Sequence, residues 1–147
     1  MDPNPFIIPP EEQPESLNVL GIEVSVLASR ATTGSREVTL QRGPANAGPP
    51  PHRHPWDESF YVLAGSVTML CEGREQTCPR GTFVHVPADR VHAFRFGPNG
   101  GEMLEFTGSG SRATEMFTAI HHAFSTGTVE MPRALKLLAQ HDIEVAA

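Results

Sequence analysis

The amino-acid sequence predicts an all-β protein, built as one antiparallel barrel or sandwich. Short runs of alternating apolar residues recur through the first two thirds of the chain, and Gly, Pro, Asn or Ser residues separate them. Apolar residues at helical spacing occur only after residue 111. The chain has 147 residues and no internal repeat, so its length fits one domain with a sizeable hydrophobic core.

The predicted strands follow one another with short turns between them. The first two form a hairpin around the turn signal TTGS, and the Pro- and Gly-rich segment 43–51 then forbids regular structure. A glycine-rich turn at 97–101 is expected to separate the last two strands. The six predicted strands are 17–29, 37–42, 59–73, 82–87, 92–96 and 102–106.

Composition divides the chain into three segments. Residues 1–16 contain five prolines and predict an extended arm, in which Phe6–Ile8 form an apolar strip. Residues 17–110 are predicted to form the barrel. Residues 111–147 carry two apolar stripes at helical spacing, which predict one or two C-terminal helices packed outside the barrel.

Charge and composition limit the classes of partner. The formal net charge is −6, the isoelectric point is near 5.6, and Lys136 is the one lysine, which argues against nucleic acid or an anionic membrane. We therefore expect a small-molecule substrate. The N-terminal residues have the features of neither a signal peptide nor a membrane span, so we expect a cytoplasmic protein with Cys71 and Cys78 as free thiols.

Two histidines stand one residue apart at the start of an apolar strand, in the stretch GPPPHRHPWDESFYVLAG at 48–65. Side chains at positions i and i+2 of a strand share a face and lie about 6.6 to 6.8 Å apart along it. The imidazoles of His52 and His54 can therefore converge on one point. Glu58 has the same parity and can join them if the chain stays extended.

The same face leads into an apolar interior, because Phe60 and Val62 continue it. A third imidazole comes from another strand, where His92 shares a face with Phe94 and Phe96. If the two strands meet inside a barrel, three imidazoles and a carboxylate surround one site. This ligand set suits one divalent transition metal ion, either Fe, Mn, Ni, Cu or Zn. The sequence thus predicts a mononuclear metal centre.

The apolar residues around this site have two interpretations. In one they are core residues, and in the other they line a substrate pocket; small barrels often combine the two roles. Polar residues of the wrong parity or on a predicted helix are interpreted as surface residues, namely Asp57, His85, His121 and His122. The predicted pocket residues are Phe60, Val62, Phe94, Phe96, Leu104 and Phe106.

The spacing of these residues resembles the first motif of the cupin family. In that motif H-x-H is followed by three residues, a glutamate, six residues and a glycine, which matches His52, His54, Glu58 and Gly65. Gly48 corresponds to the glycine that opens the motif, although it lies one or two residues nearer His52 than is usual. The sequence HPWDESFYVLAG is most similar to that of the small, single-domain, quercetin-dioxygenase-like cupins.

A second cupin motif follows with five residues between Gly81 and Pro87 and four between Pro87 and His92. Asp89 stands where the family usually has glycine, and Phe96 where it often has asparagine. The resemblance covers about residues 20 to 108. It implies a single cupin barrel, which is a double-stranded β-helix or jelly roll, with His52, His54, Glu58 and His92 as metal ligands.

The resemblance and the ligand set together imply a metal-dependent dioxygenase acting on a small aromatic or enolic compound, with Glu58 as the general base. One fold hosts many chemistries, so two alternatives remain open. The first is an isomerase, epimerase or decarboxylase that uses the metal without dioxygen. The second is a non-catalytic binding or sensor protein. The apolar strip Phe6–Ile8 and the barrel's free strand edges also predict a homodimer.

Overall fold

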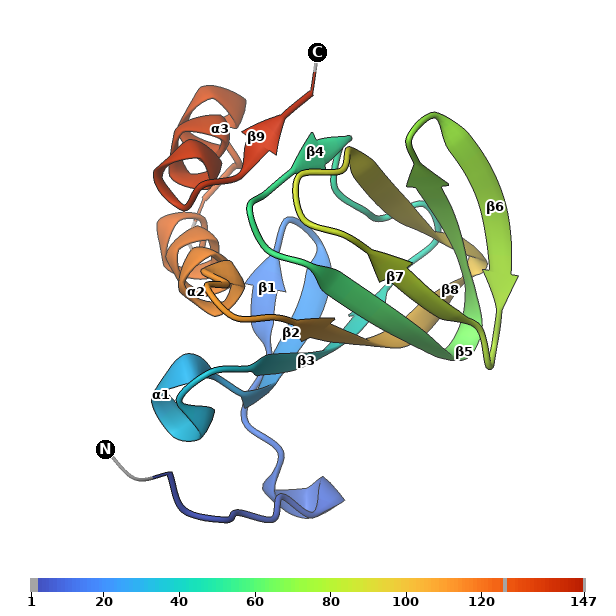
Figure 1. Cartoon of the computed structure of the whole chain (residues 1–147). Coiled ribbons are helices and arrows are strands. Elements are labelled where there is room, and N and C mark those ends of the chain that lie inside the picture. Colours follow the sequence, from blue (N-terminus) through green and yellow to red (C-terminus); the bar gives the residue numbers. More distant parts are fainter. Residues whose placement is uncertain (1–2, 126, 147) are drawn as a thin grey trace.

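The computed structural model describes residues 3–125 and 127–146, so positions 1, 2, 126 and 147 of the predicted arm and C-terminal segment lie outside the described residues. The chain forms one curled, nine-stranded sheet with helices beside it (Figure 1). All strand pairs are antiparallel. The elements are η1 Pro10–Glu12, β1 Leu17–Val19, β2 Ile22–Ala28, α1 Arg30–Thr33, β3 Glu37–Gly43, β4 His52–Arg53, β5 Glu58–Cys71, β6 Arg74–Pro79, β7 Phe83–Val86, β8 His92–Thr107, α2 Ala113–Ala123, α3 Met131–Gln140 and β9 Glu144–Val145.

Two long strands, β5 and β8, join the two halves of the barrel. They pair along nearly their whole length, from Cys71 opposite His92 to Glu58 opposite Thr107. Strands β6 and β7 add to the other edge of β5, while β3, β2 and β1 continue the sheet from β8. The pairing of β5 with β8 therefore brings the two predicted motifs together.

The turn predicted at 97–101 is wrong, because these residues lie inside β8. Gly65 pairs with Gly101, and β5 shifts its register on both sides of this point. Such irregularities bend a strand without ending it. A run of glycines is typical of a chain reversal, but here residues 97–100 form a bulge without partners on β5, and the ladder resumes on both sides, at Phe96 opposite Val67 and Gly101 opposite Gly65. The predicted strands 92–96 and 102–106 are thus two halves of one strand.

The shift also changes which residues of β8 face inward. Met103 is fully buried and Glu105 is only 4% exposed, whereas Phe106 is 38% exposed and Leu104 is partly buried. The prediction that Leu104 and Phe106 line a pocket is therefore wrong. The outer face of the sheet is also apolar here, so hydrophobicity alone did not identify the inward side.

The glycine that ends the first motif, Gly65, is required where β5 and β8 approach each other closely. Gly65 has a φ of +63°, in the left-handed region that favours glycine. A Cβ atom there would collide with the backbone oxygen of Gly100. Both the conformation and the close approach of β8 exclude a side chain.

We predict that Gly65→Ala lowers the free energy of unfolding by at least about 2 kcal/mol, because it adds a backbone collision to the left-handed strain. Gly73→Ala is the matched control, since Gly73 also has a positive φ of +78° but has open space where a Cβ atom would lie. It should lose only about 1 kcal/mol. Urea denaturation of both variants measures the difference. Equal losses would contradict the steric explanation.

The loop before β4 is fixed onto β8. The Asn46 N–H donates to the Phe96 carbonyl oxygen at 2.9 Å, and the Phe96 N–H donates to the Ala47 oxygen at 2.9 Å. A Cβ atom on Gly48 would collide with the carbonyl oxygen of Phe94. The loop therefore lies directly against the strand, and this contact explains the glycine that opens the first motif.

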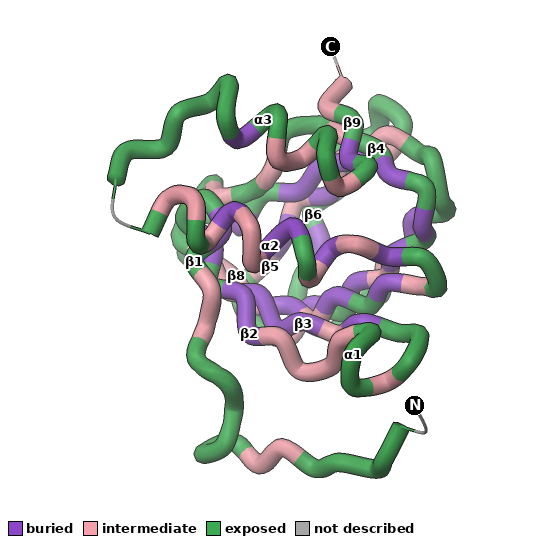
Figure 2. Tube along the Cα trace, turned by 90° about the vertical axis from the view of Figure 1, so that its left-hand side faces the viewer, coloured by how far each residue is buried: buried purple, intermediate pink, exposed green. Residues whose placement is uncertain are grey.

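The C-terminal helices lie beside the barrel, as the sequence predicts (Figure 1). Helix α2 packs against β1 and α3, and its buried residues include Met116, Phe117 and Ile120. The burial-coloured view in Figure 2 shows α2 next to the buried strands. Strand β9 was not predicted; it pairs with β4, with Val145 opposite His52. Within the described residues, none of the helices has both the length and the hydrophobicity needed to cross a membrane.

Candidate metal centre

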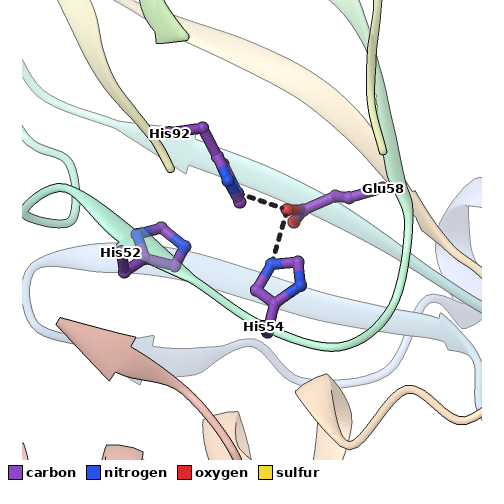
Figure 3. Close-up of side chains that lie close together, drawn as sticks. All are labelled: His52, His54, Glu58 and His92. Atoms are coloured by element: carbon purple, nitrogen blue, oxygen red, sulfur yellow. Dashed lines mark hydrogen bonds and ion pairs between the residues drawn. The ribbon is translucent and has the colours of Figure 1, made fainter. Parts of the chain in front are cut away.

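The four predicted ligands come together at one end of the barrel (Figure 3). His52 lies on β4, His54 directly after it, and Glu58 and His92 at the starts of β5 and β8. Their ligand atoms all lie within 4.8 Å of one another. Atoms bound at about 2.1 Å to one ion lie roughly 3 to 4.2 Å apart, so the observed spacing needs only a small contraction.

All three imidazoles are oriented in the same way by the backbone. In each, Nδ1 lies within hydrogen-bond distance of a carbonyl oxygen two residues away along the chain. A carbonyl oxygen can only accept, so Nδ1 carries the hydrogen and donates it. The contacts are His52 to Pro50 at 2.8 Å, His54 to Trp56 at 2.9 Å and His92 to Arg90 at 2.9 Å.

This orientation meets the needs of a metal site. With the hydrogen on Nδ1, a neutral imidazole presents the Nε2 lone pair to the point where the rings converge. Hydrogen bonds from the other ring nitrogen are the usual way in which proteins fix the tautomer of ligating histidines. The residues present therefore fit a divalent ion held by three imidazoles and the Glu58 carboxylate.

Without an ion, the Glu58 carboxylate pairs with two of the imidazoles. Its Oε2 accepts hydrogen bonds from His92 Nε2 at 2.8 Å and from His54 Nε2 at 3.0 Å. Burial alone would raise the pKa of Glu58, but these bonds hold it well below its usual value. Burial likewise opposes the charged form of His92, yet the hydrogen bond and charge of Glu58 raise the pKa of His92.

His52 has no such partner, and it is neutral at physiological pH. Burial, followed by the charge of nearby His92, lowers the pKa of His52 to about 4. Its ring centroid lies 4.4 Å from that of His92. The site thus holds one imidazole whose Nε2 is ready to bind a metal ion, and two whose Nε2 hydrogens are donated to Glu58 and must be lost first.

Residues of both motifs support His54. The Asp89 N–H donates to the His54 carbonyl oxygen at 2.9 Å. Asp89 adopts a φ of +66°, which explains why a glycine is common at this place and why Asp is tolerated. Trp56 stacks on the His54 ring with centroids 4.4 Å apart and an angle of 10°. Backbone and ring contacts together hold His54 in place.

A cavity opens beside the four ligands, with about 90 Å³ available to the centres of water-sized molecules. One water needs about 10 to 15 Å³ in this measure, so there is room for several waters or a small organic molecule. Strands, the 48–50 loop and the C-terminal elements all contribute to its wall. The lining residues are Val19, Leu20, Ile22, Val24, Gln41, Gly48, Pro49, Pro50, His52, His54, Trp56, Glu58, His92, Phe94, Glu105, Ala113, Met116, Phe117, Ile120, Leu138, Ile143 and Val145.

Of the predicted pocket residues, only Phe94 lines this cavity. Leu104 and Phe106 point outward, as described above. The remaining three are buried in the hydrophobic core and do not line the cavity; they are Phe60, Val62 and Phe96.

Three of the four residues predicted to lie on the surface are exposed, namely Asp57, His85 and His122. His121 is partly buried, and its Nδ1 accepts a hydrogen bond from the Asn18 N–H at 2.9 Å. The cysteines are free, as expected, and Cys71 pairs with Arg74 rather than with Cys78.

Sequence reasoning missed a buried polar group at the cavity. Gln41 on β3 and Glu105 on β8 both line it, and Thr39 lies next to them. The apolar residues Val38 and Leu40 share the other face of this strand, so the polar alternate residues face the cavity. The sequence does contain a pattern that could have identified them, namely a polar residue at every second position of β3. This pattern points to the cavity only once the pairing register of β3 with β8 is known. Burial and the neighbouring Glu58 charge raise the pKa of Glu105 well above its usual value.

Comparison with known proteins agrees with this geometry. Residues 36–106 match the family model described as "Cupin domain". The chain contains a cupin domain at residues 36–106. Within this cupin, the matched region contains all four ligands and both long strands. The family therefore accounts for the barrel and for the place of the candidate metal centre.

The relatives of this cupin have differing names. Quercetin 2,3-dioxygenase of Bacillus subtilis (strain 168) is 38% identical over 71 residues, which are 48% of this chain and 21% of that protein. KdgF from Halomonas sp. superimposes with a TM-score of 0.67 at 16% identity, covering 76% of this chain and 99% of that one. A sugar phosphate isomerase of the cupin superfamily from Silicibacter pomeroyi DSS-3 gives a TM-score of 0.62 at 17% identity, covering 70% and 75%. At these identities the structural likeness concerns the fold.

We predict that His92→Ala weakens zinc binding by more than about 100-fold, because it removes a ligand, and loss of supporting contacts alone costs about 10- to 100-fold. His85→Ala is the control; His85 is exposed and pairs with Ser59 Oγ at 2.8 Å. Competition titration with a chromogenic chelator measures both. Unchanged affinity in His92→Ala would contradict the assignment.

We also predict that zinc affinity falls as the pH falls through the pKa of His92, which lies above 6.5. Protonated His92 cannot bind an ion, whereas Glu58 stays ionised and His52 stays neutral over this range. Each proton that is lost on binding contributes a change of up to roughly tenfold per pH unit. The same titration between pH 8 and pH 5.5 measures the slope, and an affinity independent of pH would contradict the prediction.

Proposed function

We propose that this cupin is a dioxygenase that depends on one divalent metal ion and acts on a neutral, small aromatic or enolic compound. The observation that carries the proposal is the position of three imidazoles and a carboxylate at the wall of an apolar cavity. Such a ligand set leaves coordination positions free for a substrate oxygen and dioxygen. The likeness to quercetin 2,3-dioxygenase over 71 residues supports this choice.

When bound, the ion would supply a Lewis acid and a redox centre for the substrate. The protein's own side chains do the rest. Glu58, kept ionised by its two imidazole partners, accepts the proton of a substrate enol or phenol hydroxyl. The apolar wall formed by Phe94 and α2 residues excludes water from the deprotonated substrate. His54, which is stacked on Trp56, donates a hydrogen bond to Glu58 and so holds its carboxylate in one orientation.

The charge of the cavity favours a neutral substrate. Among the described residues that line it, none is Lys or Arg, while Glu58 and Glu105 are both carboxyl groups. An anionic group placed in this wall would be desolvated without a cationic side chain to pair with it. Phosphorylated or carboxylated substrates are therefore disfavoured, and a neutral ring compound is favoured.

A second candidate is proton-transfer chemistry without dioxygen, such as isomerisation or decarboxylation. It is favoured by Glu58 and Glu105, whose carboxyl groups both line the cavity and are near enough that the charge of Glu58, together with burial, raises the pKa of Glu105. Two adjacent carboxyl groups can take up a proton at one substrate position and return it at another. The requirement for dioxygen separates the two candidates.

We predict that protein loaded with iron, copper, nickel or manganese consumes dioxygen when supplied with a neutral flavonol, catechol or β-diketone. An oxygen electrode measures uptake, and the His92→Ala protein incubated with the same metal is the control. No uptake with any of these metals and compounds would contradict the proposal. Conversion of substrate in an anaerobic chamber would instead support the second candidate.

The homodimer expected from the sequence stays a prediction. Aromatic side chains on neighbouring strands of the outer sheet face are exposed, among them Phe83 at 62% and Tyr61 at 40%. In the arm, Phe6 is 49% and Ile7 is 90% exposed. A second copy would cover such surfaces. The cytoplasmic location and the absence of nucleic-acid and membrane partners likewise stay predictions.

A further inference from the structure

A row of buried polar side chains crosses the cavity wall on three neighbouring strands. It runs from Glu58 on β5 through Glu105 on β8 to Gln41 and Thr39 on β3. Glu105 is 4%, Gln41 2% and Thr39 1% exposed. Buried polar groups in an apolar barrel are costly unless they are paired. The metal centre explains Glu58 but leaves the other three without a function.

The hydrogen bonds within the row fix the orientation of Gln41. Its Nε2 donates to Glu105 Oε2 at 2.9 Å and to Thr39 Oγ1 at 3.2 Å, which uses both amide hydrogens. Rotating the amide by 180° would take both amide hydrogens away from these acceptors, so this orientation is the favourable one. The Gln41 Oε1 accepts no hydrogen bond from any residue between 3 and 125 or between 127 and 146. Gln41 therefore presents an unused acceptor at a cavity that it lines.

This acceptor and the metal centre belong to the same cavity. Gln41 and Glu58 both line it, and Glu105, which accepts the hydrogen bond of Gln41, lies on the strand between them. A ring compound that fills the cavity can therefore contact both the ligands and the amide.

We propose that Gln41, held by Glu105 and Thr39, is a specificity subsite whose Oε1 accepts a hydrogen bond from a second hydroxyl group of the substrate. This inference rests on the proposed function, since it assumes that the first oxygen of the substrate lies at the metal centre. It defines the substrate class as neutral ring compounds with a chelating enol or phenol oxygen and a further hydroxyl on the opposite side.

The same contacts exclude the closest competing substrates. A methyl group in place of the second hydroxyl leaves Gln41 Oε1 desolvated and unpaired, so the binding free energy lacks the net contribution of one hydrogen bond. A carboxylate at that place would face an amide oxygen and the Glu105 carboxyl group, with no cationic side chain among the described lining residues. The subsite thus selects a hydroxyl over both an apolar and an anionic substituent.

Three 5-hydroxypyran-4-ones that differ only at carbon 2 test the subsite. Kojic acid carries a hydroxymethyl group there, allomaltol a methyl group and comenic acid a carboxylate. Protein loaded with Zn²⁺ is used, because zinc has no redox chemistry and no turnover interferes. Trp56 is the single tryptophan and lines the cavity, so its fluorescence reports binding directly.

For the wild-type protein we expect kojic acid to bind about 3- to 10-fold more tightly than allomaltol, as one net hydrogen bond predicts. Comenic acid should bind more than about 10-fold more weakly than kojic acid. In Gln41→Leu the preference for kojic acid over allomaltol should disappear. Met116→Leu is the control, because it alters an apolar lining residue and should keep the preference.

Thr39→Val is a second variant should Gln41→Leu fold poorly. It removes one of the two contacts that hold the amide, so the preference should fall to an intermediate value. Equal affinities of the wild-type protein for kojic acid and allomaltol would overturn the proposal, and so would a failure of all three compounds to bind. Binding to the zinc protein does not depend on oxygenase activity, so absence of dioxygen uptake alone would refute the proposed reaction and leave the subsite standing.

Discussion

The site depends on one constraint, which is that backbone carbonyl oxygens fix all three imidazoles. Each Nδ1 donates to a carbonyl two residues away, so each Nε2 is left for the common centre. The carbonyls are themselves positioned by the loop packed on β8 and by the pairing of β5 with β8. The barrel therefore determines tautomer and direction together, and the chemistry of the cavity follows from that orientation.

The second determinant is the contrast between an apolar wall and a small number of buried carboxyl groups. Apolar surroundings strengthen each polar contact, which is why Glu58 stays ionised beside His92 although burial opposes this. They also make an unpaired group costly. Since neither Lys nor Arg is among the described lining residues, an anionic ligand would lose its hydration there without a cationic side chain to pair with.

The ligand set could be predicted from the sequence because it depends on local rules. The i, i+2 parity of His52 and His54 and the spacing to Glu58 need no knowledge of the tertiary fold, and the second motif supplies His92. The cavity wall could not be predicted in the same way. Glu105 rather than Leu104 faces inward, because an irregularity within β8 changes which alternate residues point to the interior. Such shifts are set by the pairing of β8 with β5. The contribution of α2 and β9 depends on long-range packing that periodicity does not encode.

We infer that three imidazoles bind one ion through Nε2 while Nδ1 keeps its hydrogen. Long-range ¹H–¹⁵N correlation spectra of the zinc-loaded protein observe this directly, because the two ring nitrogens have different shifts when protonated or bound. We expect three of the seven histidines in the Nδ1–H form with a metal-bound Nε2. Fewer than three such rings, or zinc bound through Nδ1, would contradict it.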